Sequence, residues 1–136
     1  ARYEANDNGY DEAIMLDHSG YVAEGTGENL FIIREGKVKT PPVVNILAGI
    51  TRRTVIDILE RENIPISEMH FGRDALYVAD EVFMTGTAAE ITPVREVDRL
   101  TIGEASPGPI TKMIQDTYTE GVRGKVEWMK KYITHC

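Results

Sequence analysis

Apolar and polar positions divide the first forty residues into short strands joined by turns. The apolar and β-branched residues gather in four runs: 12–16, 21–23, 30–34 and 37–40. Asp17–Gly20 and Glu35–Gly36 have the composition of tight turns. We therefore expect two β-hairpins. A loop should follow from Pro41–Pro42 to about Ala48, because proline gives no N–H to a sheet.

Residues 51–63 have the period of an amphipathic helix. Val55, Ile58 and Leu59 form an apolar stripe, with Ile56 beside them. We expect the charged residues of this helix to face water: Arg52, Arg53, Asp57, Glu60, Arg61 and Glu62. Further helices are predicted at 110–118 and 126–133, and residues 1–8 are compatible with a helix that ends at Asn8-Gly9.

The remaining pattern adds strands to a sheet. Runs 66–71, 81–85 and 90–97 predict strands, the last interrupted by Pro93, and 73–79 fits either a short helix or an extended segment. The mixed order predicts one α/β or α+β domain over residues 1–136, with a largely antiparallel sheet.

Composition narrows the class of protein. At 136 residues, 42% hydrophobic and 27% charged, the chain has the size and make-up of one globular domain. Its net charge of −7 argues against a nucleic-acid or anionic-membrane surface. No run has transmembrane length, so we expect a cytoplasmic protein. Cys136 is the single cysteine, and the histidines have no ligand-like spacing, so no metal site is predicted.

The stretch Gly49-Ile50-Thr51 stands at the start of the predicted 51–63 helix. The first N–H groups of a helix have no intrahelical partner, and the dipole places partial positive charge there. A glycine and a hydroxyl at this point suit a phosphate seat. On spacing alone, a turn at Gly49 and an ordinary N-cap at Thr51 explain the same residues better.

Two other stretches have chemistry of the same kind. Thr85–Ala89 follows a strand and has only small side chains, so it is either a nest of N–H groups for an anion or a tight turn. Glu24 precedes Gly25-Thr26-Gly27, where its carboxylate could face a ring nitrogen or a guanidinium, or merely water. Glu28 and Asn29 could be loop residues that bond their own backbone.

Three strings in this order resemble the fold-type IV pyridoxal-phosphate enzymes, and within them the branched-chain amino-acid aminotransferases: EGTGENLF, LAGITRR and DEVFMTGTAAEITPV. The resemblance covers roughly half the chain and extends more weakly into GPITKMIQ. It implies the C-terminal large domain of that fold, a mostly antiparallel sheet or pseudo-barrel with flanking helices. It also implies pyridoxal 5′-phosphate as cofactor and a homo-oligomer, a dimer or larger.

The resemblance gives each stretch a role. Glu24 would face the cofactor's ring nitrogen and so act in catalysis, and Leu47 would pack on the ring. The phosphate would be held around Gly49, Ile50 and Thr51 and by Gly86 and Thr87. Thr87, Ala88 and Ala89 would offer donors to the substrate carboxylate.

One part of the family's machinery has no counterpart among these residues. The six lysines, none of which has the sequence context of the family's Schiff-base lysine, are Lys37, Lys39, Lys112, Lys125, Lys130 and Lys131. The small N-terminal domain also has no counterpart. We expect this chain to be the C-terminal cofactor-binding portion of a longer enzyme and to be inactive alone.

The implied reaction of the parent enzyme is amino transfer between leucine, isoleucine or valine and 2-oxoglutarate, in branched-chain amino-acid biosynthesis. Two activities of the same fold stay open, a D-amino-acid aminotransferase and an aminodeoxychorismate lyase. A non-catalytic module that binds a phosphate compound is the alternative of another class.

Overall fold

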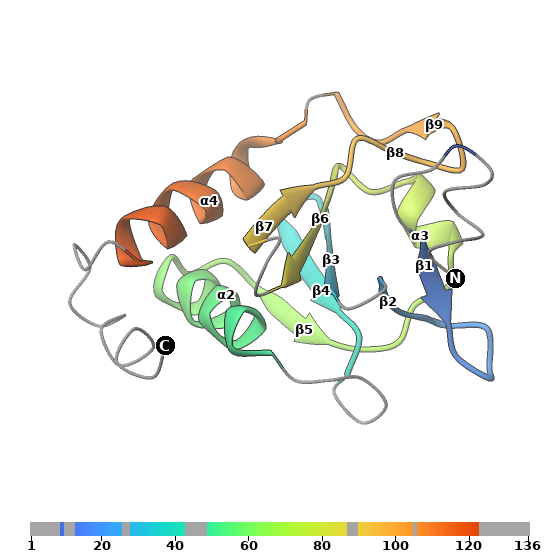
Figure 1. The fold of residues 1–136 in the computed structure, drawn as a ribbon, viewed down its shortest axis with the longest axis horizontal. Coiled ribbons are helices and arrows are strands. Elements are labelled where there is room, and N and C mark those ends of the chain that lie inside the picture. Colours follow the sequence, from blue (N-terminus) through green and yellow to red (C-terminus); the bar gives the residue numbers. More distant parts are fainter. Residues whose placement is uncertain are drawn as a thin grey trace.

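The computed structural model describes residue 9 and residues 13–25, 28–42, 49–86, 90–104 and 106–122, with the backbone alone at positions 24 and 25. Figure 1 shows the elements, which are, in chain order, β1 (Ile14–Leu16), β2 (Val22–Gly25), β3 (Asn29–Arg34), β4 (Lys37–Thr40), α2 (Ile50–Arg61), β5 (Ile66–Glu68), α3 (Asp74–Tyr77), β6 (Glu81–Gly86), β7 (Glu90–Pro93), β8 (Glu96–Val97), β9 (Leu100–Thr101) and α4 (Pro109–Val122). The helices predicted at 1–8 and 126–133 lie outside the described residues.

A five-stranded sheet in the order β5-β4-β3-β6-β7 forms the centre. Neighbouring strands in this sheet are antiparallel except for β4 and β5, a parallel pair that α2 connects. Strands β1–β2 and β8–β9 form separate hairpins. The mixed fold class, the largely antiparallel sheet and both early hairpins are confirmed.

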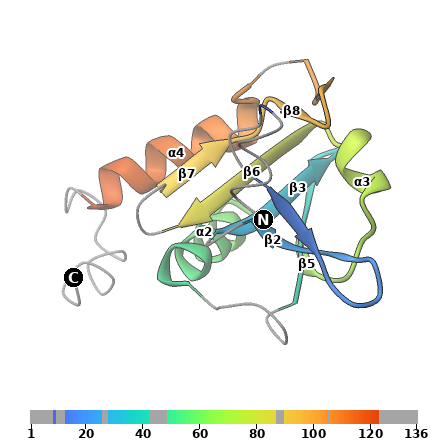
Figure 2. The ribbon, with the colours of Figure 1, turned by 45° about the vertical axis from the view of Figure 1, so that its right-hand side comes forward.

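Both faces of the central strands are covered, which explains the nearly continuous apolar runs in β3 and β6. Phe31 and Phe83 face α2 and stack at 4.9 Å with almost parallel rings. Leu30 and Met84 face the opposite side, in a second core that includes Val22 of β2. Figure 2 shows α2 and α4 on one side of these strands and α3 with β1 on the other.

Several element ends differ from the prediction for local reasons. Helix α2 ends at Arg61 rather than at position 63, because Asn63 has a left-handed φ of 58°. Strand β5 ends at Glu68, and the chain then turns toward β2, where the amide of Val22 donates to the carbonyl of Phe71. The predicted 90–97 strand divides at Pro93, whose nitrogen has no hydrogen to donate.

Two further predictions concern helices. The ambiguous segment 73–79 contains a short helix, α3, and α4 extends past the predicted 110–118 at both ends. The expectation that Arg52 faces water is wrong, because the residue is only 4% exposed. Its side chain crosses to the end of β4 and donates to the carbonyl of Pro41.

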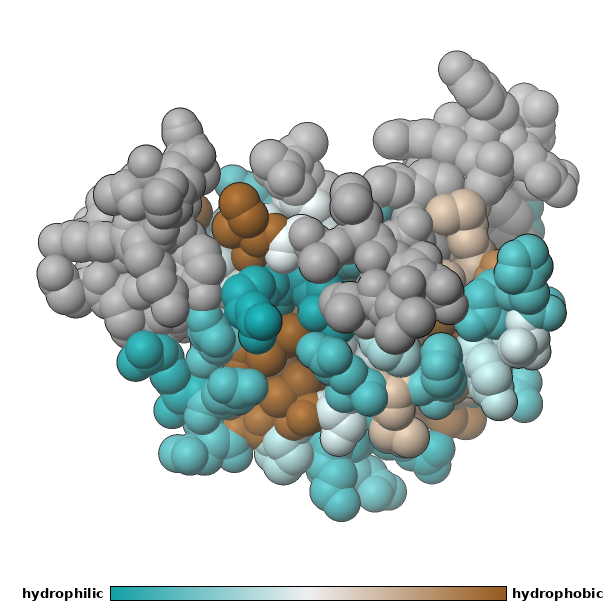
Figure 3. Space-filling model, turned by 90° about the horizontal axis from the view of Figure 1, so that it is seen from below, coloured by the Kyte–Doolittle hydropathy of each residue, from teal (hydrophilic) through white to brown (hydrophobic). Residues whose placement is uncertain are grey.

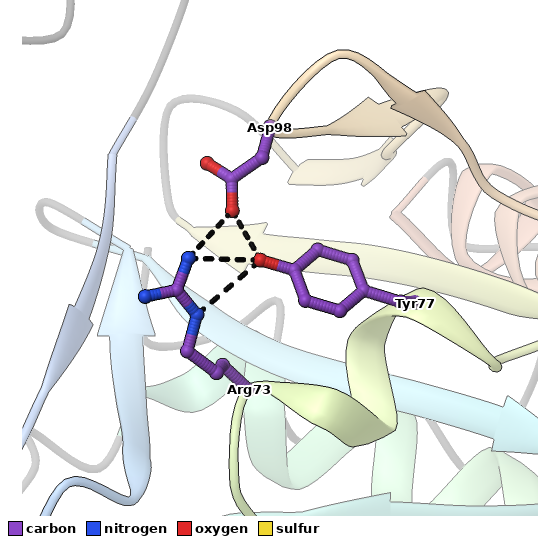
Figure 4. Close-up of polar contacts among 3 residues, drawn as sticks. All are labelled: Arg73, Tyr77 and Asp98. Carbon is purple, nitrogen blue, oxygen red and sulfur yellow. Dashed lines mark hydrogen bonds and ion pairs between the residues drawn. The ribbon is translucent and has the colours of Figure 1, made fainter.

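A polar contact joins α3 to the β8–β9 turn (Figure 4). Arg73 donates to the hydroxyl of Tyr77 and forms an ion pair with Asp98 at 3.0 Å, and the Tyr77 hydroxyl donates to the same Asp98 oxygen. The pKa of Arg73 is raised above its ordinary value, first by the hydrogen bond to Tyr77 and then by Asp98. The contact links the β8–β9 turn to α3 at an exposed position, where ion pairs contribute little to stability.

Within the described part of the chain, no helix combines the length and apolar character that a membrane span requires.

Candidate functional site

The predicted stretches meet at one end of the central sheet. Asn29, the first residue of β3, pairs in register with Thr85 near the end of β6. A Cβ at Gly49 would lie 3.2 Å from Asn29 Oδ1, so the backbone before α2 lies directly against that side chain. Residues far apart in sequence thus place the start of α2, the start of β3 and the end of β6 at one point.

Gly49 is the N-cap of α2, and no side chain caps the helix. Its backbone is extended, with φ −90° and ψ 152°, and the first turn of the helix contains no acidic residue. Thr51 is the second helical residue, so its interpretation as the N-cap is wrong. The amides of Ile50 and Thr51 therefore stand in the first turn, where helical geometry gives them no partner.

The side chains at this helix start point in different directions. Ile50 is 58% exposed, so the polar group that it can offer a ligand is its backbone amide. Thr51 is buried, and its hydroxyl lies 3.5 Å from the hydroxyl of Tyr118 on α4. This long contact places the first turn of α2 beside α4.

Buried polar side chains gather around this point. The five residues that we call the polar sheet end are Asn29, Thr40, Thr51, Arg52 and Thr85. The hydroxyl of Thr40 donates to the carbonyl of Leu30 at 2.7 Å. Thr85 is fully buried, and among the described residues its hydroxyl has no hydrogen-bond partner. A buried polar atom without a protein partner indicates a bound water or ligand, so this end of the sheet suits a polar ligand.

Other predicted site residues are located only in part. The backbone of Glu24 lies in β2, paired with Met15, and Gly86 ends β6 opposite Glu90. Leu47, Thr87, Ala88 and Ala89 lie outside the described residues.

The three lysines that the structure describes, Lys37, Lys39 and Lys112, are all exposed. Lys37 and Lys39 have exposed side chains on β4. Lys112 is exposed on α4 and pairs with Asp116 at 3.1 Å. None of these three is buried with the polar residues.

Sequence patterns missed several residues of the site. Asn29 belongs to a strand rather than to a loop, and Arg52 is buried rather than solvated. Thr85 gave a usable signal, since it is the one polar residue inside the run Val82–Thr85 before a glycine. The contribution of Tyr118 depends on how α4 packs on α2, which local sequence does not specify.

Comparison with known proteins identifies the family. The sequence profile described as Amino-transferase class IV matches residues 1–97. The chain belongs to the class IV aminotransferases.

Curated relatives of this class IV chain are named as branched-chain enzymes. It is 54% identical over 136 residues to the "Probable branched-chain-amino-acid aminotransferase" of Aquifex aeolicus. The match covers 98% of this chain and 44% of the relative. This class IV sequence therefore spans less than half the length of that relative.

Solved structures of branched-chain aminotransferases have the same fold. The enzyme from Thermoproteus uzoniensis with norvaline superimposes with a TM-score of 0.90 at 51% identity, covering 95% of this chain and 43% of that one. The PLP form of the Thermobaculum terrenum enzyme superimposes with a TM-score of 0.93 at 43% identity, covering 96% of this chain and 43% of that one. The fold-type IV resemblance is confirmed for this class IV domain.

Proposed function

We propose that the complete enzyme transfers amino groups between branched-chain L-amino acids (leucine, isoleucine or valine) and 2-oxoglutarate with pyridoxal 5′-phosphate. In this proposal the 136-residue chain is its cofactor-binding portion. The observation that carries the proposal is the meeting of the uncapped start of α2 with Asn29 and Thr85 at the polar sheet end. The names of the similar proteins described above, which are branched-chain aminotransferases, support the substrate class.

The start of α2 fits the phosphate of the cofactor. The cap residue Gly49 has no side chain over the first turn, and the first turn contains no carboxylate that would repel an anion. The amides of Ile50 and Thr51, with the Thr51 hydroxyl, would donate to the phosphate oxygens. Thr87 would complete the phosphate contacts.

Leu47 would pack on the ring of the cofactor. When bound, pyridoxal phosphate supplies an electron sink for the carbanion formed at the substrate's α-carbon. The carboxylate of Glu24 would hold a proton on the ring nitrogen. The backbone of Glu24 lies in the β1–β2 hairpin, paired with Met15, and this pairing would fix its position. Donors in the turn Gly86–Ala89 would bind the substrate carboxylate.

The reaction also needs a lysine that binds the cofactor covalently and moves the proton at the α-carbon. The side chains of the described lysines are exposed rather than buried among the polar residues, which supports the proposal that this chain alone has no transaminase turnover. The complete enzyme would supply that lysine together with the small domain.

We also propose that the complete enzyme is a homo-oligomer, because hydrophobic side chains are exposed at the surface of this chain. Figure 3 shows hydrophobic side chains at the surface among hydrophilic ones on one face of the molecule. The large hydrophobic residues that are exposed are Leu16, Tyr21, Ile50, Met69, Val78, Leu100 and Val122. Light scattering after size exclusion tests this part of the proposal. A monomer of the complete enzyme across the micromolar range contradicts it.

The decisive experiment assays the complete enzyme against three substrates: L-leucine with 2-oxoglutarate, D-alanine with 2-oxoglutarate, and aminodeoxychorismate. We expect turnover with L-leucine, and its loss in Glu24→Gln with the cofactor still bound. Arg53→Gln, which changes an exposed residue beside the site, is the control and should keep its activity. Turnover with D-alanine or aminodeoxychorismate in place of L-leucine refutes the branched-chain assignment.

A further inference from the structure

Arg52 stands at an unusual place for a buried cation. It is the third residue of α2, and its side chain is 5% exposed. Its Nη2 donates to the carbonyl of Pro41 at 3.1 Å and lies 3.4 Å from Glu68 Oε1. Among the described residues, its buried Nε has no partner. The guanidinium is therefore held by groups at the ends of β4 and β5.

Electrostatics alone would not place a cation here. The start of a helix has partial positive charge, and a basic residue in the first turn adds to it. The first turn of α2 has no acid to offset this charge, and the side chain of Glu68 is 44% exposed. A half-exposed carboxylate is screened by water and compensates the guanidinium only in part. The start of α2 thus has an excess of positive charge that an anion would balance.

The same side chain also fixes geometry. Pro41 is the residue at which the chain leaves β4, and Gly49 is the residue at which it enters α2. The bond from Arg52 to Pro41 joins the first turn of α2 to the other end of the segment between them. This bond therefore ties the first turn of α2, which contains the Ile50 and Thr51 amides, to the end of β4.

We propose that Arg52 is a positioning residue for the cofactor phosphate. Without touching the phosphate, it orients the first turn of α2 through Pro41 and adds positive charge beneath it. The inference rests on the proposed phosphate seat at Ile50 and Thr51.

The test measures binding of pyridoxamine 5′-phosphate and of pyridoxamine to the 136-residue chain by calorimetry. These ligands have no aldehyde, so they do not react with surface lysines. The ratio of the two affinities reports the phosphate contribution, which general damage to the fold would not change selectively. Circular dichroism checks that each variant is folded.

Arg52→Gln should weaken binding of the phosphorylated ligand about tenfold and leave pyridoxamine unchanged, as expected for a unit charge within about a Debye length of a phosphate. Arg53→Gln removes the same charge from the exposed neighbouring residue and should stay within about twofold, because exposed charges are screened. Arg52→Lys keeps the charge and should restore most of the affinity.

Glu68→Gln should change the affinity for the phosphorylated ligand in the opposite direction from Arg52→Gln. It removes the partial compensation of Arg52 from an exposed side chain, so it should tighten the phosphorylated ligand about threefold. A purely structural ion pair would give weaker binding instead. If Arg52→Gln does not fold, this variant decides: tighter binding supports the inference, and equal or weaker binding overturns it.

The two proposals fail in different ways. If the unaltered chain binds pyridoxamine 5′-phosphate no better than pyridoxamine, the proposed phosphate seat is wrong and the role of Arg52 fails with it. If the unaltered chain prefers the phosphorylated ligand and folded Arg52→Gln keeps that preference, the seat stands and the role of Arg52 is wrong.

Discussion

Glu81 anchors α4 to the sheet, and its replacement should test how the helix is held. Its side chain belongs to the first residue of β6 and is buried. It accepts hydrogen bonds from the amides of Thr111 at 2.8 Å and Ile110 at 3.2 Å. These are first-turn amides of α4, so a carboxylate here satisfies two donors and interacts favourably with the partial positive charge at the start of the helix.

The magnitude follows from these two contacts. A hydrogen bond to a charged group contributes about 1.5–3 kcal/mol. Glutamine keeps one acceptor oxygen but turns an NH₂ group toward the second amide, so one bond is lost and the other loses its charge. We expect Glu81→Gln to lower the free energy of unfolding by about 2–3 kcal/mol.

Urea unfolding followed by circular dichroism measures this loss. Glu104→Gln, which removes the same charge from an exposed position, is the control and should change stability by less than about 0.5 kcal/mol. Gly108→Ala breaks the same contact without changing charge, since its Cβ would lie 2.4 Å from the Glu81 side chain. Equal urea midpoints for Glu81→Gln and Glu104→Gln would refute the anchoring role.

Two other substitutions test the packing. Phe83→Ala removes one ring of the buried Phe31–Phe83 stack and should lower the free energy of unfolding by about 3–5 kcal/mol in the same urea assay. A loss below about 1 kcal/mol would contradict the two-sided core. Gly103→Ala should prevent stable folding, because φ is +62° and the Cβ would lie 2.0 Å from the carbonyl oxygen of Asp80. Gly72→Ala is the control, because a Cβ at Gly72 meets open space. Equal melting temperatures for the two variants would show that the Gly103 contact is wrong.

The sequence predicted the elements whose pattern is local. The apolar run of β3 and the stripe of α2 follow from burial of one or both faces, and the Asp17–Gly20 turn follows from turn chemistry. Element ends were less predictable, because they depend on single residues such as Pro93 and on where the chain goes next.

Long-range contacts explain what the sequence could not predict. Arg52 has the sequence position of a solvated residue and is buried only because β4 and β5 bring Pro41 and Glu68 to it. Thr51 could cap the helix by its composition, yet Gly49 takes that position. The candidate stretches were visible as motifs, but their meeting depends on the register that places Asn29 opposite Thr85.

The central claim is that the first turn of α2 binds the cofactor phosphate, and amide resonances test it most directly. We would record ¹⁵N–¹H spectra of the 136-residue chain while pyridoxamine 5′-phosphate is added, with pyridoxamine as the control. We expect the Ile50 and Thr51 amides to shift the most, and only with the phosphorylated ligand, and we expect Thr51→Val to weaken the effect. Saturating binding that leaves both amides unshifted would contradict it.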